Sequence, residues 1–204
     1  MSPTDLYSET ISSYFQTYVD SYYKAIKSID LNSLDRAFTT IVKTIESNSW
    51  IYFCGNGGSA EISNHMECDH LKGTSSNTSL LPRVKSLSSN VGLISAVAND
   101  IDYSEVYSYQ LSRVGRAGDL LISVSSSGNS TNIIKAQTAA SSLGITTIAL
   151  TGFNGGESKS LANISLHVPE SNYGIVEDAH QSILHILAQY IRKTHLTTSG
   201  LIIY

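Results

Sequence analysis

The chain has 204 residues, of which 41% are apolar and 15% are charged, which is typical of a globular protein of one domain. A formal net charge of −4, with basic residues only in scattered pairs, argues against a nucleic-acid partner. No segment approaches the ~20 apolar residues of a membrane span, and the start of the chain lacks the pattern of a signal peptide. We therefore expect a cytoplasmic protein with no membrane partner. The two cysteines give no disulfide framework, and Cys54 is expected to be a small core residue.

Residues 1–49 are predicted to form a layer of two helices. Through residues 5–29, apolar side chains recur every three or four positions, which is the helical period. A second helix is expected to begin at Asn32, whose side chain would cap it, with an apolar stripe from Leu34 to Ile45. Both helices are too long for a linker, so we expect them to pack on a partner subunit.

From residue 50 onward, short apolar runs alternate with helical stretches. Strands are expected at 50–54, 85–89, 119–125, 145–151 and 164–168, and helices at 60–72, 91–98, 102–115, 130–143 and 176–194. This alternation predicts an α/β fold, a doubly wound parallel five-stranded sheet flanked by helices. The α/β core would span residues 50–194 of a single domain, and the sequence does not indicate a role for the apolar tail at 195–204.

Two turns rich in serine and glycine follow predicted buried strands. The first is Cys54-Gly-Asn-Gly-Gly-Ser59 and the second is Ser123-Val-Ser-Ser-Ser-Gly-Asn-Ser130. Backbone N–H groups, a helix N-terminus and short hydroxyls together bind an anion at such a turn. Neither turn matches a P-loop or a G-x-G-x-x-G motif, and no lysine follows, so a sugar phosphate is favoured over a nucleotide.

The helix after the first turn has polar residues at steps of four. Glu61, His65 and Asp69 therefore share one helix face. An imidazole and a carboxylate at this spacing can reach one metal ion or one substrate. The alternative is a solvated face with local polar contacts.

The last predicted helix contains Glu177, Asp178, His180 and His185 among apolar residues. His185 fits either a site or a core histidine, and Glu177 with His180 fits either a site or a local hydrogen bond. Glu177 and His185 are separated by roughly 12 Å of helix rise, which one regular helix does not easily bring to one ion. Contributions from different subunits would remove this difficulty.

Two further segments contain polar residues or glycines that suit a loop. Asn99-Asp100 could meet sugar hydroxyls, or could form an Asx turn that caps a helix. The loop Thr151-Gly-Phe-Asn-Gly-Gly156 is expected to be structural.

Four segments, Cys54–Ser59, Ala98–Asp100, Gly118–Ser130 and Ala149–Gly156, together resemble the sugar isomerase (SIS) domain. Within it they most resemble the phosphoheptose isomerases, and the likeness runs in order from about residue 10 to 194. It implies conversion of sedoheptulose 7-phosphate to D-glycero-D-manno-heptose 7-phosphate through an enediol. It also implies a homotetramer with active sites between subunits, one zinc ion per subunit, and a product destined for lipopolysaccharide core or capsule heptose.

The resemblance assigns roles residue by residue. The substrate site would comprise Asn56, Gly57, Gly58, Ser59, Asn99, Asp100, Ser125, Ser126, Ser127, Ser130 and Glu177. The metal ligands would be His65, Asp69, Glu177 and His185, and Asp69 with His185 would transfer protons, with base and acid unassigned. Asp69, Glu177 and Gly174 stand where the family has glutamate, glutamine and aspartate. These departures are compatible with a related but different sugar phosphate.

A binding module is the main alternative to an enzyme. Some SIS proteins that resemble phosphoheptose isomerases act as tetrameric adaptors for the bacterial replication initiator, or sense sugar phosphates. The adaptor type lacks the acid that matches Asp69 and the histidine that matches His185. Because this chain has both, an isomerase is favoured, with an adaptor, a sensor or an isomerase of another sugar phosphate as alternatives.

Overall fold

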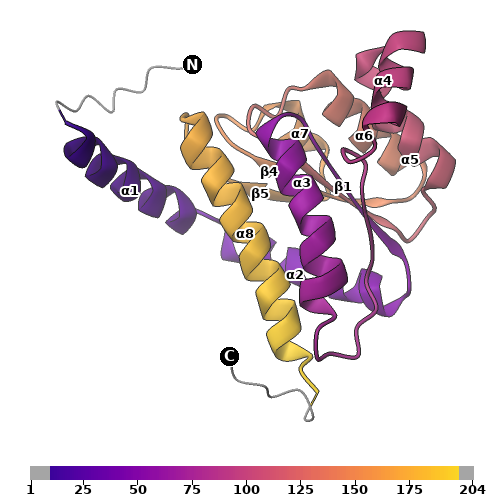
Figure 1. Cartoon of the computed structure of the whole chain (residues 1–204), viewed down its shortest axis with the longest axis horizontal. Helices are drawn as coiled ribbons and strands as arrows, with labels where there is room; N and C mark the ends of the chain where they lie inside the picture. The colour runs from indigo at the N-terminus through magenta and orange to yellow at the C-terminus, as the bar shows by residue number, and fades with distance from the viewer. Residues whose placement is uncertain (1–9, 198–204) are drawn as a thin grey trace.

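The computed structural model describes residues 10–197, and its centre is a five-stranded parallel sheet with helices on both faces (Figure 1). The strands are β1 (Trp50–Gly55), β2 (Arg83–Ser86), β3 (Leu120–Ser125), β4 (Thr146–Thr151) and β5 (Ile164–His167). Their order is β2-β1-β3-β4-β5, and every neighbouring pair is parallel. The predicted doubly wound α/β sheet is therefore confirmed.

Successive residues of a strand point to opposite faces of the sheet, so each face is covered by its own hydrophobic core. Ile51 and Phe53 of β1 pack with α2 (Leu31–Glu46), α3 (Gly58–Cys68) and α8 (Tyr173–Thr194). Tyr52 and Cys54 face the other side, where α4 (Val91–Asp100), α5 (Ser108–Val114) and α6 (Thr131–Ser142) cover the sheet. Cys54 is fully buried, which confirms the expectation of a core cysteine. None of the described helices is long and apolar enough to cross a bilayer.

The two N-terminal helices are present, with different starts from those predicted. α1 (Ile11–Lys27) is capped by Thr10 and extends away from the sheet, contacting α8 (Figure 1). The predicted cap at Asn32 is wrong. The Asp30 carboxylate accepts the backbone N–H groups of Asn32 and Ser33 instead, so α2 begins at Leu31. Residues 5–9 of the first predicted helix lie outside the described residues.

Several other boundaries differ from the predictions. The helix expected at 60–72 is α3 followed by a π-helix, η1 (Asp69–Thr74), and the one expected at 102–115 is a 3-10 helix, η2 (Tyr103–Glu105), followed by α5. A short helix, α7 (Gly156–Leu161), lies outside the predicted helices, because its N-cap and its first residue, Gly155 and Gly156, are glycines, which favour a loop. β2 ends at Ser86, since beyond it the Ser88 hydroxyl bonds the Gly55 backbone in place of a further rung of the ladder. In the tail, Leu196 bridges to Thr78, and residues 198–204 lie outside the described range.

Candidate functional site

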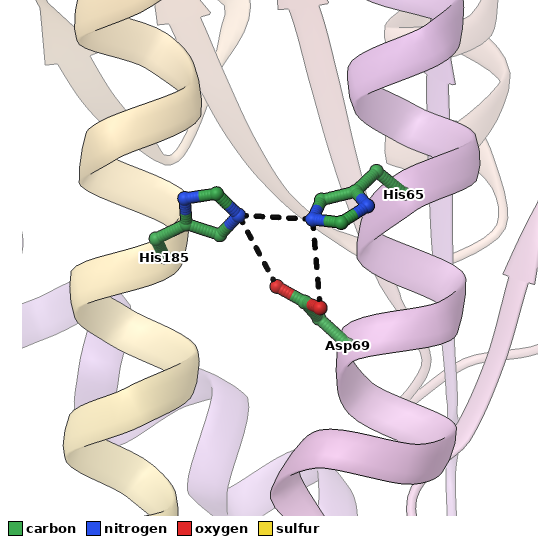
Figure 2. A group of neighbouring side chains, drawn as sticks. All are labelled: His65, Asp69 and His185. Carbon is green, nitrogen blue, oxygen red and sulfur yellow. Dashed lines mark hydrogen bonds and ion pairs between the residues drawn. The ribbon is translucent and has the colours of Figure 1, made fainter.

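Two histidines and one aspartate converge between α3 and α8 (Figure 2). The Nε2 atoms of His65 and His185 are 3.0 Å apart. Asp69 lies between them, with Oδ1 at 3.5 Å from His65 Nε2 and Oδ2 at 3.4 Å from His185 Nε2. One ligand atom from each of the three residues lies within 4.8 Å of the other two. The geometry thus joins three of the side chains singled out from the sequence.

The local folding of two helices produces this cluster. His65 is in the last turn of α3, and Asp69 follows four residues later as the first residue of the π-helix η1. α8 packs alongside α3 and η1, which brings His185 to the pair although it is 120 residues away in the chain (Figure 1). Glu61, the third acidic or basic residue on the predicted face, is exposed and is not part of the cluster.

The donor set suits a divalent metal ion. Two imidazoles and a carboxylate are ligands that zinc accepts, and three protein ligands leave a coordination position for a substrate oxygen. The amide nitrogen of Gln181 also lies 2.8 Å from His185 Nε2, so an N–H there would use the same lone pair that a metal ion requires. The sequence did not single out Gln181, because its only sequence signal is its position four residues before His185 in the same helix.

Glu177 lies away from this cluster, at the first turn. A Cβ on Gly58 would approach Glu177 Oε2 to 2.6 Å, so the carboxylate sits directly over the N-terminus of α3. Burial, followed by the neighbouring Asp178 charge, raises the pKa of Glu177. Within the described residues Glu177 is not a member of the His65–Asp69–His185 group. Its role as a fourth metal ligand stays a prediction.

The two serine-glycine turns lie next to each other, because β1 and β3 are neighbours in the sheet. Asn56 and Asn132 exchange amide hydrogen bonds of 2.9 Å across the two turns. The hydroxyls of Tyr103 and Tyr107 donate to Asn56 Oδ1 at 3.0 and 3.1 Å. Asn132, Tyr103 and Tyr107 were missed by the sequence analysis, since their positions follow from tertiary packing. Asn56 therefore joins the first turn to the N-terminus of α6.

The serines of the second turn divide into two kinds. Ser125 Oγ and Ser127 Oγ accept the backbone N–H groups of Gly128 and Asn129, so they shape the turn itself. Ser126 Oγ is buried and has no partner among the described residues. Ser130 precedes α6 as its N-cap but forms no side-chain capping bond. Ser126 and Ser130 therefore have hydroxyl groups that are free to form a hydrogen bond with a bound ligand.

The first turn is shaped by glycine and by a buried serine. Gly57 has φ +56° at the N-cap of α3, a conformation that glycine adopts readily. Ser59 is buried, and its backbone N–H donates to the Asn56 carbonyl. The first turn thus presents the N-terminus of α3, the arrangement that favours a phosphate.

Asn99 and Asp100 are the last two residues of α4 and are exposed. Asn99 Nδ2 donates to Asp100 Oδ1 at 2.8 Å. The alternative of a helix cap is wrong, because Asp102 caps η2 by accepting the N–H of Ser104. Contact of Asn99 and Asp100 with a sugar stays a prediction.

The core histidine of α8 is His180, and the expectation that His185 could fill this role is wrong. His180 is fully buried, whereas the side chain of His185 is 37% exposed. Neither ring nitrogen of His180 has a hydrogen-bond partner among the described residues, so the alternative of a bond with Glu177 is wrong as well. Burial lowers the pKa of His180 to about 4.

Comparison with known proteins agrees with this arrangement. The SIS domain family model matches residues 13–152. A phosphoheptose isomerase of Akkermansia muciniphila is 35% identical over 173 residues, which cover 84% of this chain and 89% of that protein. One of Helicobacter pylori (strain P12) is 31% identical over 185 residues, which cover 91% of this chain and 95% of that protein.

Solved structures give the same result. The phosphoheptose isomerase of Neisseria gonorrhoeae superimposes with a TM-score of 0.81 at 27% identity, covering 90% of this chain and 97% of that one. That of Francisella tularensis superimposes with a TM-score of 0.80 at 28% identity, covering 90% and 96%. The sheet, the two turns and the sequence likeness lead to one conclusion: the chain belongs to the phosphoheptose isomerase family of SIS-domain proteins.

Proposed function

We propose that this protein converts sedoheptulose 7-phosphate to D-glycero-D-manno-heptose 7-phosphate. The observation that carries the proposal is the convergence of His65, Asp69 and His185 beside α3, the helix that begins at the first turn. His65 lies six residues after Ser59, or about 9 Å along a helix axis. One ligand can therefore place its phosphate at the turns and its reacting carbons at the cluster.

The turns would hold the phosphate without a cationic side chain. Backbone N–H groups at the N-termini of α3 and α6 supply positive potential, and the hydroxyls of Ser126 and Ser130 supply further donors. Asn56 fixes the spacing of the two turns through its bonds to Asn132. In this proposal Gly57, Gly58, Ser59, Ser125 and Ser127 complete the cradle, and Asn99 and Asp100 meet sugar hydroxyls.

The isomerisation moves one proton between adjacent carbons and one between their oxygens. Asp69 and His185 lie 3.4 Å apart, close enough to act on the same substrate atoms or on each other. We assign proton transfer to this pair and leave the base and the acid unassigned. An imidazole nitrogen that coordinates a cation has no lone pair left for a proton, so the base must act through an atom that is free during turnover. A carboxylate with two oxygens, such as Asp69, can satisfy this condition.

His65, Asp69 and His185 would hold one zinc ion per subunit, with Glu177 as the fourth ligand. When bound, zinc would polarise the carbonyl and hydroxyl oxygens of the substrate. Two imidazoles and a carboxylate fit that ion, which supports the assignment. For Glu177 to act as the fourth ligand, its side chain must adopt another conformation, or the Glu177 must come from another subunit.

A homotetramer is part of the same proposal. The outer face of α1 exposes Ile11, Phe15 and Tyr23, with exposed fractions of 80%, 59% and 58%. Apolar side chains at this spacing on a projecting helix favour a covering partner, which we take to be another copy of this chain. A cytoplasmic location is also part of the proposal, and a role in heptose supply for lipopolysaccharide or capsule rests on the family likeness alone.

Turnover of sedoheptulose 7-phosphate by metal-depleted and zinc-reloaded protein tests the proposal. We expect zinc-dependent product, and a loss of at least about 100-fold in Asp69→Ala. Asp35→Ala removes an exposed carboxylate on α2 and is the matched control, with unchanged turnover. Full activity without metal would remove zinc from the mechanism. Failure of the folded protein to form product would favour another sugar phosphate or an adaptor.

A further inference from the structure

A group of arginines and aromatic residues lies at the opposite end of the sheet from the proposed active site. Trp50 begins β1 and Arg83 begins β2, while Arg116 is just before β3. Because the strands are parallel, these amino ends share one edge of the sheet. Arg113 and Tyr109 of α5 line the same region. We call Trp50, Tyr109, Arg83, Arg113 and Arg116 the arginine-aromatic site, and none of them belongs to the proposed active site.

Two adjoining cavities open at the arginine-aromatic site. One, of about 510 Å³, is lined by aromatic and aliphatic side chains that include Trp50, Tyr52, Leu87 and Leu93. The other, of about 560 Å³, is lined by Arg83, Arg113 and Arg116. Trp50, Arg113 and Val114 border both cavities, so one molecule could occupy the two together. Each volume falls in the range of small-molecule sites.

The arginines have the arrangement of an anion site. Arg83 stacks over the Trp50 ring at 4.7 Å and Arg113 over the Tyr109 ring at 5.0 Å, which orders the guanidinium planes. Among residues 10–197, no carboxylate forms an ion pair with Arg83, Arg113 or Arg116. The one acid in the cavity wall, Asp119, is occupied by the backbone N–H groups of Trp50 and Arg116, at 2.8 and 2.9 Å.

The apolar cavity also contains a buried polar group. Gln110 is 8% exposed and lines this cavity. Its Nε2 donates to the carbonyls of Leu87 and Val106, at 2.9 and 2.7 Å, which fixes the orientation of the amide. Its Oε1 accepts no hydrogen bond from the described part of the chain. A ligand with an amino group on an aromatic ring would satisfy this acceptor.

We propose that the arginine-aromatic site binds a nucleoside diphosphate whose base has an exocyclic amino group. The base would occupy the 510 Å³ cavity beside Trp50 and Gln110, and the diphosphate would contact the guanidinium groups in the adjoining cavity. Arg83 also donates to the Asn48 carbonyl at 3.3 Å, but none of the three arginines pairs with a carboxylate of residues 10–197, so an aromatic cavity beside them fits this ligand in shape and charge. The site differs from the two serine turns, neither of which has a nucleotide motif, and it does not depend on the proposed isomerase activity.

Calorimetric titration of the intact protein with ADP tests the proposal. ADP should bind at least about tenfold more tightly than inorganic diphosphate or adenosine, because each lacks half of the contacts. Inosine diphosphate should bind more weakly than ADP, because a carbonyl replaces the amino group that faces Gln110. Arg113→Ser should weaken ADP binding about tenfold. Arg36→Ser, an exposed arginine near the β5 edge, is the control and should leave ADP binding unchanged.

Three results would overturn the inference. The first is no measurable ADP binding, and the second is equal affinity for ADP and diphosphate. The third is displacement of ADP by excess sedoheptulose 7-phosphate, which would place the nucleotide at the serine turns. Failure of isomerase turnover would leave all the ADP results interpretable, so the two proposals fail separately.

Discussion

Gly128 is the residue at which the second serine turn approaches the loop before α7 most closely. Its φ is +66°, and a Cβ there would lie 1.9 Å from the Gly155 carbonyl oxygen. We expect Gly128→Ala to lower the free energy of unfolding by at least about 2 kcal/mol, since both the backbone conformation and the contact are unfavourable for a side chain. Urea unfolding measures this. Gly73→Ala is the control, because no described atom outside its own turn of helix lies within 4 Å of its Cβ position, and an equal loss there would refute the steric argument.

Gly58 offers a test of the fourth metal ligand. A Cβ at Gly58 would meet the end of the flexible Glu177 side chain at 2.6 Å, so Gly58→Ala should displace the carboxylate with little effect on stability. If Glu177 is a ligand, it must leave this position, so Glu177→Ala should weaken zinc binding about tenfold in competition with a chelator, whereas Gly58→Ala should not weaken it. Unchanged zinc affinity in Glu177→Ala would remove Glu177 from the ligand set and leave His65, Asp69 and His185.

At the residue scale, the sequence could predict the cluster but not its surroundings. His65 and Asp69 were indicated by their i,i+4 spacing, and His185 by the resemblance. The core role suggested for His185 belongs to His180, which shares the buried helix face with Val176, Ala179 and Ile183. Asn132, Tyr103 and Tyr107 could not be found, because their contacts with Asn56 join segments that are distant in the chain.

At the scale of elements, the strands were predictable because each is a short apolar run between turns. The boundary errors have local causes. Asp30, and not Asn32, is the N-cap of α2. A π-helix replaces the last turn of the helix expected at 60–72. No single-sequence pattern signals a π-helix. The first residue of this one is Asp69, so the change of helix type occurs at a residue of the proposed site.

Two tyrosines attach α1 to α8. Tyr18 donates to the Asp178 carboxylate at 2.6 Å, and the hydroxyls of Tyr22 and Ser182 are 2.7 Å apart. We expect Tyr18→Phe and Tyr22→Phe each to lower the free energy of unfolding by about 1 kcal/mol at fixed protein concentration. Tyr14→Phe is the control on the same helix, because the Tyr14 hydroxyl bonds no described residue. Equal effects in all three variants would show that the two hydrogen bonds do not secure α1.

At the scale of the whole molecule, the two ends of the sheet differ in chemistry. The serine turns follow the carboxyl ends of β1 and β3, as expected for parallel sheets, so their location was predictable. The approach of α8 to α3 was not, because it depends on how the last helix packs on the sheet. That packing places His185 in the cluster, and it also buries His180 among apolar side chains, where a positive charge would be poorly solvated.

His180 should make the stability of the whole protein sensitive to acid. Burial lowers its pKa from 6.5 to about 4, and the nearby His167 adds to this shift. Between these values the unfolded chain binds a proton that the folded chain does not, so stability falls as the pH drops from 6.5 toward 4. We expect His180 to account for about 2 kcal/mol of the loss in the free energy of unfolding between pH 7 and pH 5.

Urea unfolding at both pH values should show a smaller loss in His180→Leu than in wild type or in the control His195→Gln. An unchanged loss in His180→Leu would mean that His180 is protonated in the folded protein and does not cause the acid sensitivity. The cause would then be another group, such as His70, because burial also lowers the pKa of His70 to about 4.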